Sequence, residues 1–389
     1  MITKIKNGRL ILQDGIFEKN LYIENEKILA ITEEELSFDS EIDAEGNYVS
    51  AGFIDIHVHG GGGYNFSDAT KEAAVEAANI HAKHGTTTIY PTFSSFSYEH
   101  MVRALEVIRE YKDDDEIIPN ILGVHMEGPY FSPEQVGGQS KSCVRNPDPL
   151  EYKKLISDFG GLIKRWSYAP ELDGADEFLD YLNQRDIIPA AAHTNAEFED
   201  IKKAYDKGLT LITHLYSCTS TITRKGGFRI LGVTETAYLY DDIFVEAIAD
   251  GCHLPPELLE IIYKYKGWEH MCLITDAIRY GGVENAENVT YKNGDNICII
   301  EDGVAKLADR SAFSGSIATT DKLVKTCVKK AQIPLFSAVK MITEVPAKIM
   351  KLNTKGKLCE KMDADIVIFD EDINIKRVFI SGKEKFCNL

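Results

Sequence analysis

The sequence predicts an α/β protein: a (β/α)8 TIM barrel that carries a small β-sandwich built from both chain termini. Two observations lead to this prediction. Eight β-type runs follow one another through the middle of the chain, and each is followed by a segment that can form a helix. Eight such units are what a closed barrel requires. Short β-type runs separated by turn residues, without helices, occupy both ends of the chain.

The barrel units can be placed along the chain. The β-type runs lie at residues 53–59, 86–92, 120–127, 163–171, 187–194, 210–215, 244–250 and 271–277. Apolar residues at helical spacing predict a helix over 69–84, and a proline in the first turn favours another over 255–266. The loops at 128–148, 216–228 and 278–313 are long, and most of the last is expected to form a hairpin of its own. Loops that follow barrel strands lie at the carboxyl face, where the chemistry of such barrels takes place.

The terminal runs are expected to pair with each other, because chain termini often lie close together. The β-type runs of the first 50 residues have counterparts at 364–370 and 377–380. We therefore predict that residues 1–50 plus 350–389 form the β-sandwich domain and that residues 51–349 form the barrel domain.

Composition excludes several classes of protein. The 389 residues include 43 Lys and Arg against 61 Asp and Glu, a net charge of −18, which repels the phosphate backbone of nucleic acids. No run approaches the roughly 18 apolar residues of a membrane helix, and no signal peptide is recognisable. The eight cysteines contain no Cys-x-x-Cys pair and are expected to be reduced thiols. A cytoplasmic protein that contacts neither nucleic acid nor membrane is therefore expected.

The first barrel strand ends in a His-x-His pair. Period-two alternation places Asp55, His57 and His59 on one face of this strand. Two imidazoles on one rigid face can converge on a metal ion. Taken alone, the short motif fits a pair of hydrogen-bonded core histidines equally well.

Further ligand-type residues follow other strands. Glu127, His193, His214 and Asp276 each come directly after an apolar run. An isolated carboxylate there would be costly to bury, whereas a metal ion removes that cost. Imidazole and carboxylate ligands without thiolate suit divalent ions. We expect a bound divalent ion, Zn²⁺ first, with Fe, Mn or Co as alternatives.

A metal at this position implies hydrolysis. A divalent ion lowers the pKa of bound water toward about 7, so that hydroxide can attack a carbonyl carbon. A carboxylate nearby can take the proton of the water and pass it to the leaving group. Asp276 is the candidate, because the last strand returns beside the first when a barrel closes. Its alternative role is the N-cap of a following helix.

These motifs resemble the metal-dependent amidohydrolase superfamily, and within it the deacetylases of phosphorylated N-acetyl amino sugars. The resemblance extends over the whole chain and rests on the stretches 51–60, 81–88, 125–130, 249–253, 274–277, 314–316 and 356–367. The most specific stretch is His125-Met126-Glu127-Gly128-Pro129, because most of the superfamily has a lysine where this chain has glutamate.

The resemblance implies a role for each matching residue. Glu127, His193 and His214 correspond to the main metal ligands, and Asp276 to the catalytic acid and base. His57 and His59 correspond to a second metal position, so the resemblance implies one or two ions per subunit. The expected substrate contacts are His253 at the sugar phosphate, with Gly138, Ser314 and Gly315 in loops that line the sugar. The implied reaction converts N-acetylglucosamine 6-phosphate to glucosamine 6-phosphate and acetate, and the implied assembly is a homodimer.

The chain departs from the family pattern at the substrate end. Leu215-Tyr216-Ser217-Cys218 replaces the usual Leu-Phe-Asn-Ala, so that Ser217 and Cys218 are the residues expected to touch the sugar. Gln139 stands where a histidine commonly polarises the acetyl carbonyl.

The phosphate-binding arginine of the family, often supplied by the neighbouring subunit, has only Arg224, Lys225 and Arg229 as candidates. A solvated loop is the equally weighted alternative for these three. An amidohydrolase acting on N-acetylgalactosamine 6-phosphate or an N-acyl amino acid is the alternative function. A non-catalytic, sugar-sensing metal barrel is the alternative class.

Overall fold

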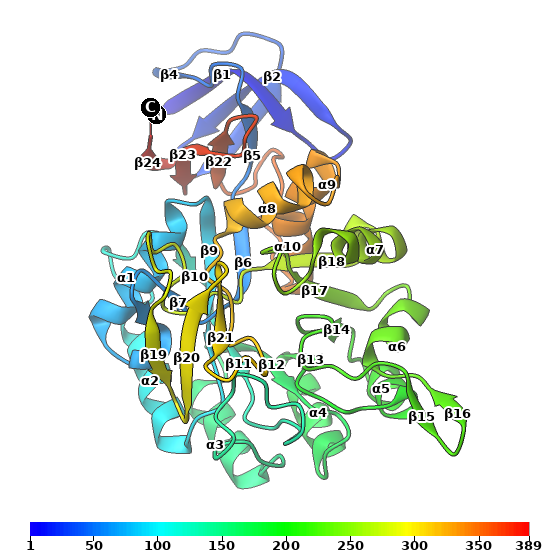
Figure 1. The fold of residues 1–389 in the computed structure, drawn as a ribbon. Helices are drawn as coiled ribbons and strands as arrows, with labels where there is room; N and C mark the ends of the chain where they lie inside the picture. The colour runs from blue at the N-terminus through cyan, green and yellow to red at the C-terminus, as the bar shows by residue number, and fades with distance from the viewer. Residues whose placement is uncertain (389) are drawn as a thin grey trace.

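The computed structural model describes residues 1–388. The eight predicted strands form a parallel barrel (Figure 1). They are β6 (Phe53–Val58), β9 (Thr86–Phe93), β10 (Asn120–Ile121) with β11 (Val124–Glu127), β12 (Ile163–Tyr168), β13 (Ile188–Ala191), β14 (Leu211–Ile212), β17 (Phe244–Ile248) and β18 (Met271–Ile274). The predicted barrel is confirmed, and its third strand is divided into β10 and β11.

The barrel closes between its last and first strands. The sheet runs in the order β10-β9-β11-β12-β13-β14-β17-β18, and β6 pairs with β9. Just beyond β18, the Asp276 amide donates to the His57 carbonyl at 2.9 Å, and the His59 amide donates to the Ala277 carbonyl at 2.8 Å. Closure therefore places the residue after the last strand directly beside the His-x-His pair of the first.

Helices cover the outside of the barrel. They are α1 (Lys71–Ala82), α2 (Tyr98–Tyr111), α3 (Pro149–Phe159), α4 (Ala175–Asn183), α5 (Phe198–Asp206), α6 (Val233–Leu239), α7 (Pro256–Lys266), α8 (Thr320–Lys329), α9 (Leu335–Ile342) and α10 (Glu344–Ile349), with short 3-10 turns η1 (Phe66–Asp68) and η2 (Trp268–His270). The helix expected over 69–84 begins later because the Thr70 side chain caps α1, accepting from the Ala73 amide. No helix within residues 1–388 is both long and apolar enough to cross a bilayer.

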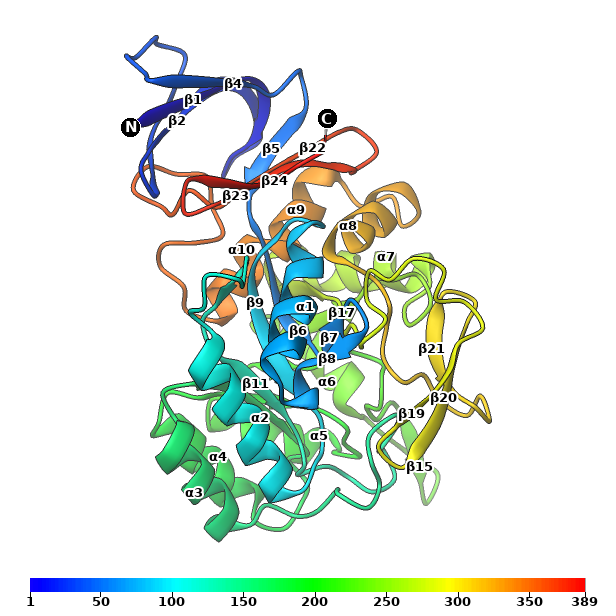
Figure 2. The same ribbon diagram turned by 90° about the vertical axis from the view of Figure 1, so that its left-hand side faces the viewer.

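The two chain ends meet in one sheet above the barrel (Figure 2). Its strands are β1 (Ile2–Ile11), β2 (Ile16–Glu24), β3 (Lys27–Thr32), β4 (Ser40–Asp43), β5 (Tyr48–Ala51), β22 (Ile366–Phe369), β23 (Ile375–Ile380) and β24 (Lys383–Cys387). The antiparallel pair β5 and β22 joins the N-terminal strands to the C-terminal ones, with Ser50 opposite Val367. The expected pairing of the ends is present as one continuous, hydrogen-bonded sheet. Its apolar core contains Leu10, Val49 and Ile366, and the division at residues 50 and 350 stays a proposal.

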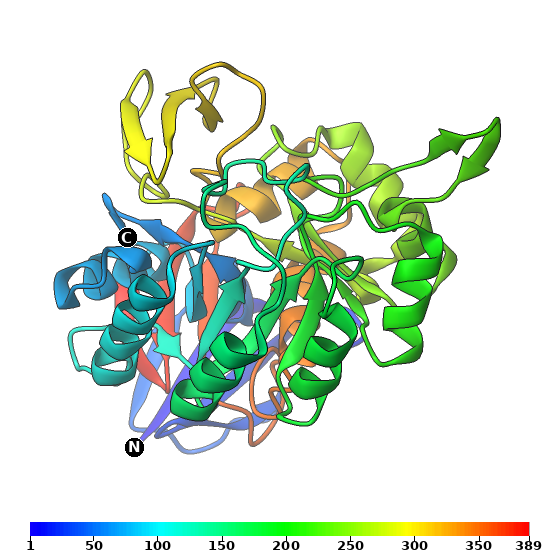
Figure 3. The same cartoon turned by 90° about the horizontal axis from the view of Figure 1, so that it is seen from below.

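The long loops carry small strands of their own at the carboxyl face, seen from below in Figure 3. These are β7 (Gly60–Gly61) with β8 (Tyr64–Asn65), the hairpin β15 (Thr223–Lys225) and β16 (Phe228–Ile230), and the meander β19 (Thr290–Asn293), β20 (Asn296–Glu301) and β21 (Val304–Leu307). The hairpin expected within 278–313 is therefore a three-stranded meander. In Figure 3 the β15–β16 hairpin projects away from the body of the barrel.

Candidate metal centre

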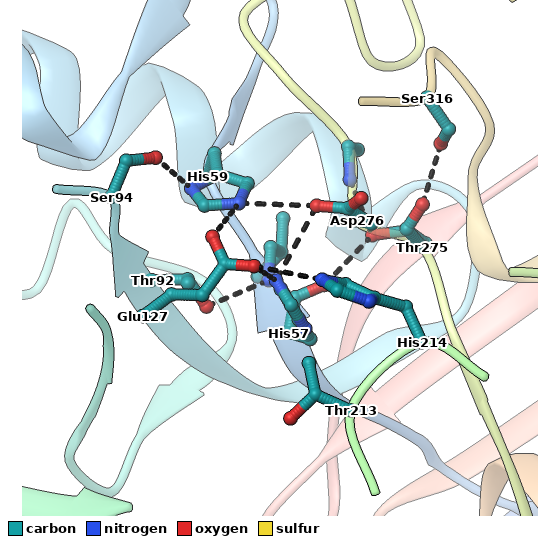
Figure 4. Close-up of polar contacts among 12 residues, drawn as sticks. His57, His59, Thr92, Ser94, Glu127, Thr213, His214, Thr275, Asp276 and Ser316 are labelled. Atoms are coloured by element: carbon teal, nitrogen blue, oxygen red, sulfur yellow. Dashed lines mark hydrogen bonds and ion pairs between the residues drawn. The ribbon is translucent and has the colours of Figure 1, made fainter. Parts of the chain in front are cut away.

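Six ligand-type side chains meet at the carboxyl end of the barrel strands, and Figure 4 labels all of them except His193. They form two groups, His57 with His59 and Asp276, and Glu127 with His193 and His214, and the ligand atoms within each group lie within 4.8 Å of one another. All six are buried or nearly so. The strand-end residues singled out in the sequence thus come together in space.

Glu127 lies between the two groups. Its Oε1 is 3.0 Å from His214 Nε2 and 3.2 Å from His193 Nε2. Its Oε2 is 3.3 Å from His59 Nε2, and His57 Nε2 lies 3.5 Å from Oε1. One carboxylate therefore faces all four imidazoles.

Backbone conformation directs three of these side chains into the mouth of the barrel. His193, His214 and Asp276 have φ values of 45°, 28° and 48°, in the left-handed region that L residues seldom adopt. Such strain persists where the surrounding structure enforces it, typically at functional sites. At Asp276 the enforcing contacts are backbone hydrogen bonds: its amide donates to His57, and its carbonyl accepts from the Ser316 amide at 2.9 Å.

Backbone carbonyls set the tautomers of the two histidines in the second group. His193 Nδ1 lies 2.8 Å from the Gln135 carbonyl, and His214 Nδ1 lies 3.0 Å from the Ser217 carbonyl. A carbonyl only accepts, so both Nδ1 atoms donate, and in the neutral imidazoles the Nε2 atoms carry the lone pairs that metal ligands require. Both Nε2 atoms face Glu127.

The first group is held in a similar way. His59 Nδ1 lies 3.2 Å from Ser94 Oγ, and His57 Nδ1 lies 3.2 Å from a carboxylate oxygen of Glu246. His57 Nε2 is buried and has no hydrogen-bond partner among the described residues. A buried nitrogen without a partner is costly, and a metal ion in the site would satisfy it.

The electrostatics of the cluster favour a cation. Burial would lower the pKa of His57, but the charges of Glu127 and Asp276 outweigh it and raise the pKa to about 10 in the metal-free chain. Burial would likewise raise the pKa of Glu127, yet the surrounding imidazoles, His57 first, hold it well below its usual range. A potential that draws protons onto imidazole also draws a divalent ion. The nitrogen and oxygen donors thus fit Zn²⁺ and related ions.

Asp276 has the environment of an ionised base. Burial raises its pKa, but His57 and then His59, whose Nε2 lies 3.1 Å from Oδ1, lower the pKa below its ordinary value. Its side chain reaches the cleft described next. The expected alternative, a helix N-cap, is not what the structure contains: Ala277 pairs with Ser316 in an isolated parallel β-bridge, and no helix begins there.

A cleft of about 280 Å³ opens beside the two groups. Its lining includes most of the substrate contacts expected from the sequence: Gly138, Gln139, Ser217, Cys218, His253, Ser314 and Gly315. Tyr216, Phe313 and Asn293 also line it and were not anticipated. The cleft therefore draws on the loops after β11, β14 and β17 and on the segment after the meander.

Close packing explains the glycines in this wall. A Cβ at Gly138 would lie 2.8 Å from the Ser314 Cα, so the two loops could not approach as they do. Gly315 has a φ of 94°, and a Cβ there would lie 2.6 Å from Ile278 Cγ2. Glycine at both positions lets the two loops form one wall.

Gln139 makes a contact that its sequence position did not suggest. Its amide nitrogen donates to Glu127 Oε2 at 2.6 Å, and its amide oxygen accepts from the Ser95 backbone amide at 2.7 Å. The side chain is therefore held against a metal ligand. The expectation that it polarises an acyl carbonyl stays a prediction.

His253 is oriented by a carboxylate. Its Nδ1 lies 2.7 Å from Asp250 Oδ2, and its ring packs against Phe313 at a centroid distance of 4.7 Å. Asp250 also accepts from the His253 backbone amide at 2.8 Å. The imidazole is thus fixed in the wall of the cleft, and its expected contact with a sugar phosphate stays a prediction.

The three basic candidates for phosphate binding lie elsewhere. Arg224, Lys225 and Arg229 are exposed on the β15–β16 hairpin, and Lys225 pairs with Glu197 at 2.5 Å. Among residues 1–388, no lysine or arginine lines the cleft. None of the three lines the cleft of its own subunit, because the antiparallel hairpin that carries them projects away from the barrel (Figure 3). Their contact with a phosphate group stays a prediction.

Sequence reasoning missed two buried charges beneath the centre, Arg165 and Glu246. They form an ion pair, and both are fully buried. Burial would raise the pKa of Glu246, but Arg165 and His57 hold it below its ordinary value. The signal was present in part, since each is a charged residue within a barrel strand, Arg165 on β12 and Glu246 in the otherwise apolar β17.

Comparison with known proteins agrees with the site. The chain belongs to the amidohydrolase family, whose model matches residues 48–385. Among its relatives is the N-acetylglucosamine-6-phosphate deacetylase of Lysinibacillus sphaericus, 30% identical over 343 residues, with 88% of this chain and 87% of the relative covered. The crystal structure of the deacetylase of that name from Pasteurella multocida superposes with a TM-score of 0.91 at 27% identity, covering 100% of both chains.

The structure of a further relative was solved in complex with a phosphorylated sugar. The Mycobacterium smegmatis N-acetyl-D-glucosamine-6-phosphate deacetylase, a mutant in complex with N-acetyl-D-glucosamine-6-phosphate, has a TM-score of 0.89 and 26% identity, with 99% of this chain and 98% of that chain covered. The resemblance found in the sequence is confirmed at the level of family and fold.

Proposed function

We propose that this chain hydrolyses the acetamide group of N-acetyl-D-glucosamine 6-phosphate to D-glucosamine 6-phosphate and acetate. The observation that carries the proposal is the pair of ligand groups with Asp276 facing one cleft. Relatives with this activity in their names match nearly the whole chain, which supports the choice of substrate. All eight cysteines are unpaired, in keeping with action in the reducing cytoplasm.

Two sets of residues would hold the ions. Glu127, His193 and His214 form the main site, and His57 with His59 forms a second, so the chain can hold one or two divalent ions. Zn²⁺ is the first choice for these donors, with Fe, Mn or Co as alternatives. When bound, the ion supplies a Lewis acid and lowers the pKa of water to about 7, which makes hydroxide available at neutral pH.

Asp276 supplies the proton transfers. Its ionised carboxylate accepts a proton from the attacking water, whose oxygen bonds to the acetyl carbon. As the carbon–nitrogen bond breaks, Asp276 returns the proton to the nitrogen, which leaves as the amine of the sugar. The water oxygen ends in acetate. His253, Ser314 and Gly315 form the wall against which the sugar is held.

The direct test is acetate release by the purified chain from N-acetylglucosamine 6-phosphate. We expect chelation to abolish release and re-addition of Zn²⁺ to restore it, because the ion supplies the nucleophile. Release that survives complete chelation would contradict the metal chemistry. No release from a folded, metal-loaded sample would contradict the substrate and point to another acyl-amine. Only inactivity on those substrates as well would favour the non-catalytic, sugar-sensing alternative.

Two observations favour other candidate substrates. No lysine or arginine among residues 1–388 lines the cleft to meet a phosphate, which favours an N-acyl amino acid, and Ser217 and Cys218 replace the usual sugar-contacting pair, which favours another sugar such as N-acetylgalactosamine 6-phosphate. N-acetylgalactosamine 6-phosphate and N-acyl amino acids are therefore assayed beside the proposed substrate. A higher kcat/KM for either would replace it.

We further propose that the chain acts as a homodimer in which the β15–β16 hairpin supplies phosphate contacts to the partner's cleft. Phe228, 76% exposed, and Ile222, 51% exposed, give this hairpin apolar surface beside its basic residues. We expect Arg224→Ala or Arg229→Ala to raise KM for the phosphorylated sugar about tenfold or more, the effect of losing a charge-assisted contact. Unphosphorylated N-acetylglucosamine should be unaffected.

The control for this experiment is Arg185→Ala, on an exposed turn away from the hairpin. Light scattering gives the mass of each variant. A monomeric parent chain would contradict the proposed dimer. An unchanged KM in both hairpin variants would contradict the phosphate contact and favour the alternative that the hairpin is a solvated loop.

A further inference from the structure

We propose that Glu246, with Arg165 as its counter-ion, is a positioning residue that ties the two groups of metal ligands together. The inference rests on the metal centre of the proposed function. Neither residue lines the cleft, and both are fully buried beneath the centre. Their effect on the reaction therefore passes through the ligands.

Glu246 contacts one ligand from each group. Its Oε2 lies 3.2 Å from His57 Nδ1 and accepts from the His214 backbone amide at 3.3 Å. His57 belongs to the group that includes Asp276, whereas His214 belongs to the group that includes Glu127. A single carboxylate oxygen thus fixes the ring of one ligand and the backbone of another.

Arg165 contacts the residues that directly precede the same two ligands. Its Nη2 donates to Thr213 Oγ1 at 2.8 Å, and its Nη1 donates to the Ile56 carbonyl at 3.3 Å. Arg165 also forms the ion pair with Glu246 Oε1. Each of the two ligand-bearing strand ends is therefore contacted once by Glu246 and once by Arg165.

The chemistry of the contact suits a ligand-orienting role. A carboxylate that accepts a hydrogen bond from Nδ1 holds the imidazole ring in place. It also makes Nε2 a stronger electron-pair donor to a metal ion. His57 Nε2 is the nitrogen that has no partner among the described residues. An isolated carboxylate at this depth would be costly, and Arg165 offsets its charge without reaching the cleft.

The alternative is an ion pair that serves the barrel core alone. The two roles differ in what happens when both charges are removed together, since a buried pair can often be replaced by apolar residues without loss of stability. A purely structural pair replaced in this way leaves metal binding unchanged, whereas a positioning pair does not.

The test compares Glu246→Gln, Arg165→Met and the double variant Glu246→Leu/Arg165→Met. The double variant is included because either single change leaves a buried partner unmatched. The matched control is Lys355→Met/Asp365→Leu, which removes another buried ion pair, 2.6 Å between Nζ and Oδ2, beneath the terminal sheet. Zn²⁺ affinity and stoichiometry are measured by competition with a chromophoric chelator, and Tm is measured on chelated protein.

We expect the double variant to fold and to bind Zn²⁺ about 10–100-fold more weakly, the usual effect of losing an outer partner of a ligand. The absorption spectrum of bound Co²⁺ should also change. The control should keep the parental affinity. Parental affinity and spectrum in the folded double variant would overturn the proposal, as would an equal loss of affinity in the control. Metal titration needs no substrate. A parental chain that binds Zn²⁺ but releases no acetate would therefore contradict the proposed function and leave the role of Glu246 and Arg165 open to the same test.

Discussion

Asp276→Asn is expected to lower kcat for acetate release by about 10²–10⁴-fold, the range that general acid–base catalysis contributes. An amide has the shape of the carboxyl group but cannot accept the proton of water or return it to the amine. Asparagine also tolerates left-handed backbone, so the φ of 48° at this position does not prevent folding. Steady-state kinetics, with metal content measured on the same sample, give the result.

The control for this variant is Asp302→Asn. Asp302 is exposed and also has a left-handed φ, 57°, so it tests the same substitution in the same backbone conformation away from the centre. We expect parental kinetics from it. Turnover within a few-fold of the parent in Asp276→Asn would remove this residue from the proton transfers.

Glu127→Gln is expected to abolish activity for a different reason, because the variant loses its affinity for the metal ion. The Glu127 carboxylate faces four imidazoles, and each of its oxygens lies within 3.3 Å of at least one Nε2. A neutral amide cannot balance the charge of a divalent ion there. We expect Zn²⁺ affinity to fall by more than the roughly 10–100-fold typical of residues that only orient ligands, with loss of activity in parallel.

Metal analysis after dialysis and acetate release with added Zn²⁺ measure this effect. Glu260→Gln, on the exposed side of α7, is the matched control and should retain both metal and activity. A Glu127→Gln chain that keeps its metal would show that Glu127 is not a ligand. Together the two variants separate loss of the base from loss of the ion.

Local pattern was enough to predict the architecture and to bring out the candidate metal ligands. Strand-length apolar runs that alternate with helical segments predict a barrel, because each pattern depends on residues near one another in the chain. The ligands could be found for a related reason. Closure of a parallel barrel brings all strand ends to one face, so His57, His214 and Asp276 had to converge once the strands were placed.

The sequence could not place side chains on long loops or show which buried charges meet. Arg224 and Arg229 were candidates for phosphate contact, and only the structure shows that they lie on an antiparallel hairpin that projects away from the barrel (Figure 3). Gln139 contacts Glu127 because the loop after β11 folds back over its own strand.

By itself, the sequence determined the fold class, the strand ends that carry the ligands and the residue types that suit a divalent ion, since these follow from periodicity and donor chemistry. Only the tertiary structure decided that Glu246 and Arg165 lie beneath both ligand groups and that no lysine or arginine of residues 1–388 lines the cleft. Arg165 on β12 and Glu246 on β17 are 81 residues apart in the sequence. Both also contact residues of the first strand, β6. Such contacts depend on barrel closure and loop packing, which no local pattern encodes.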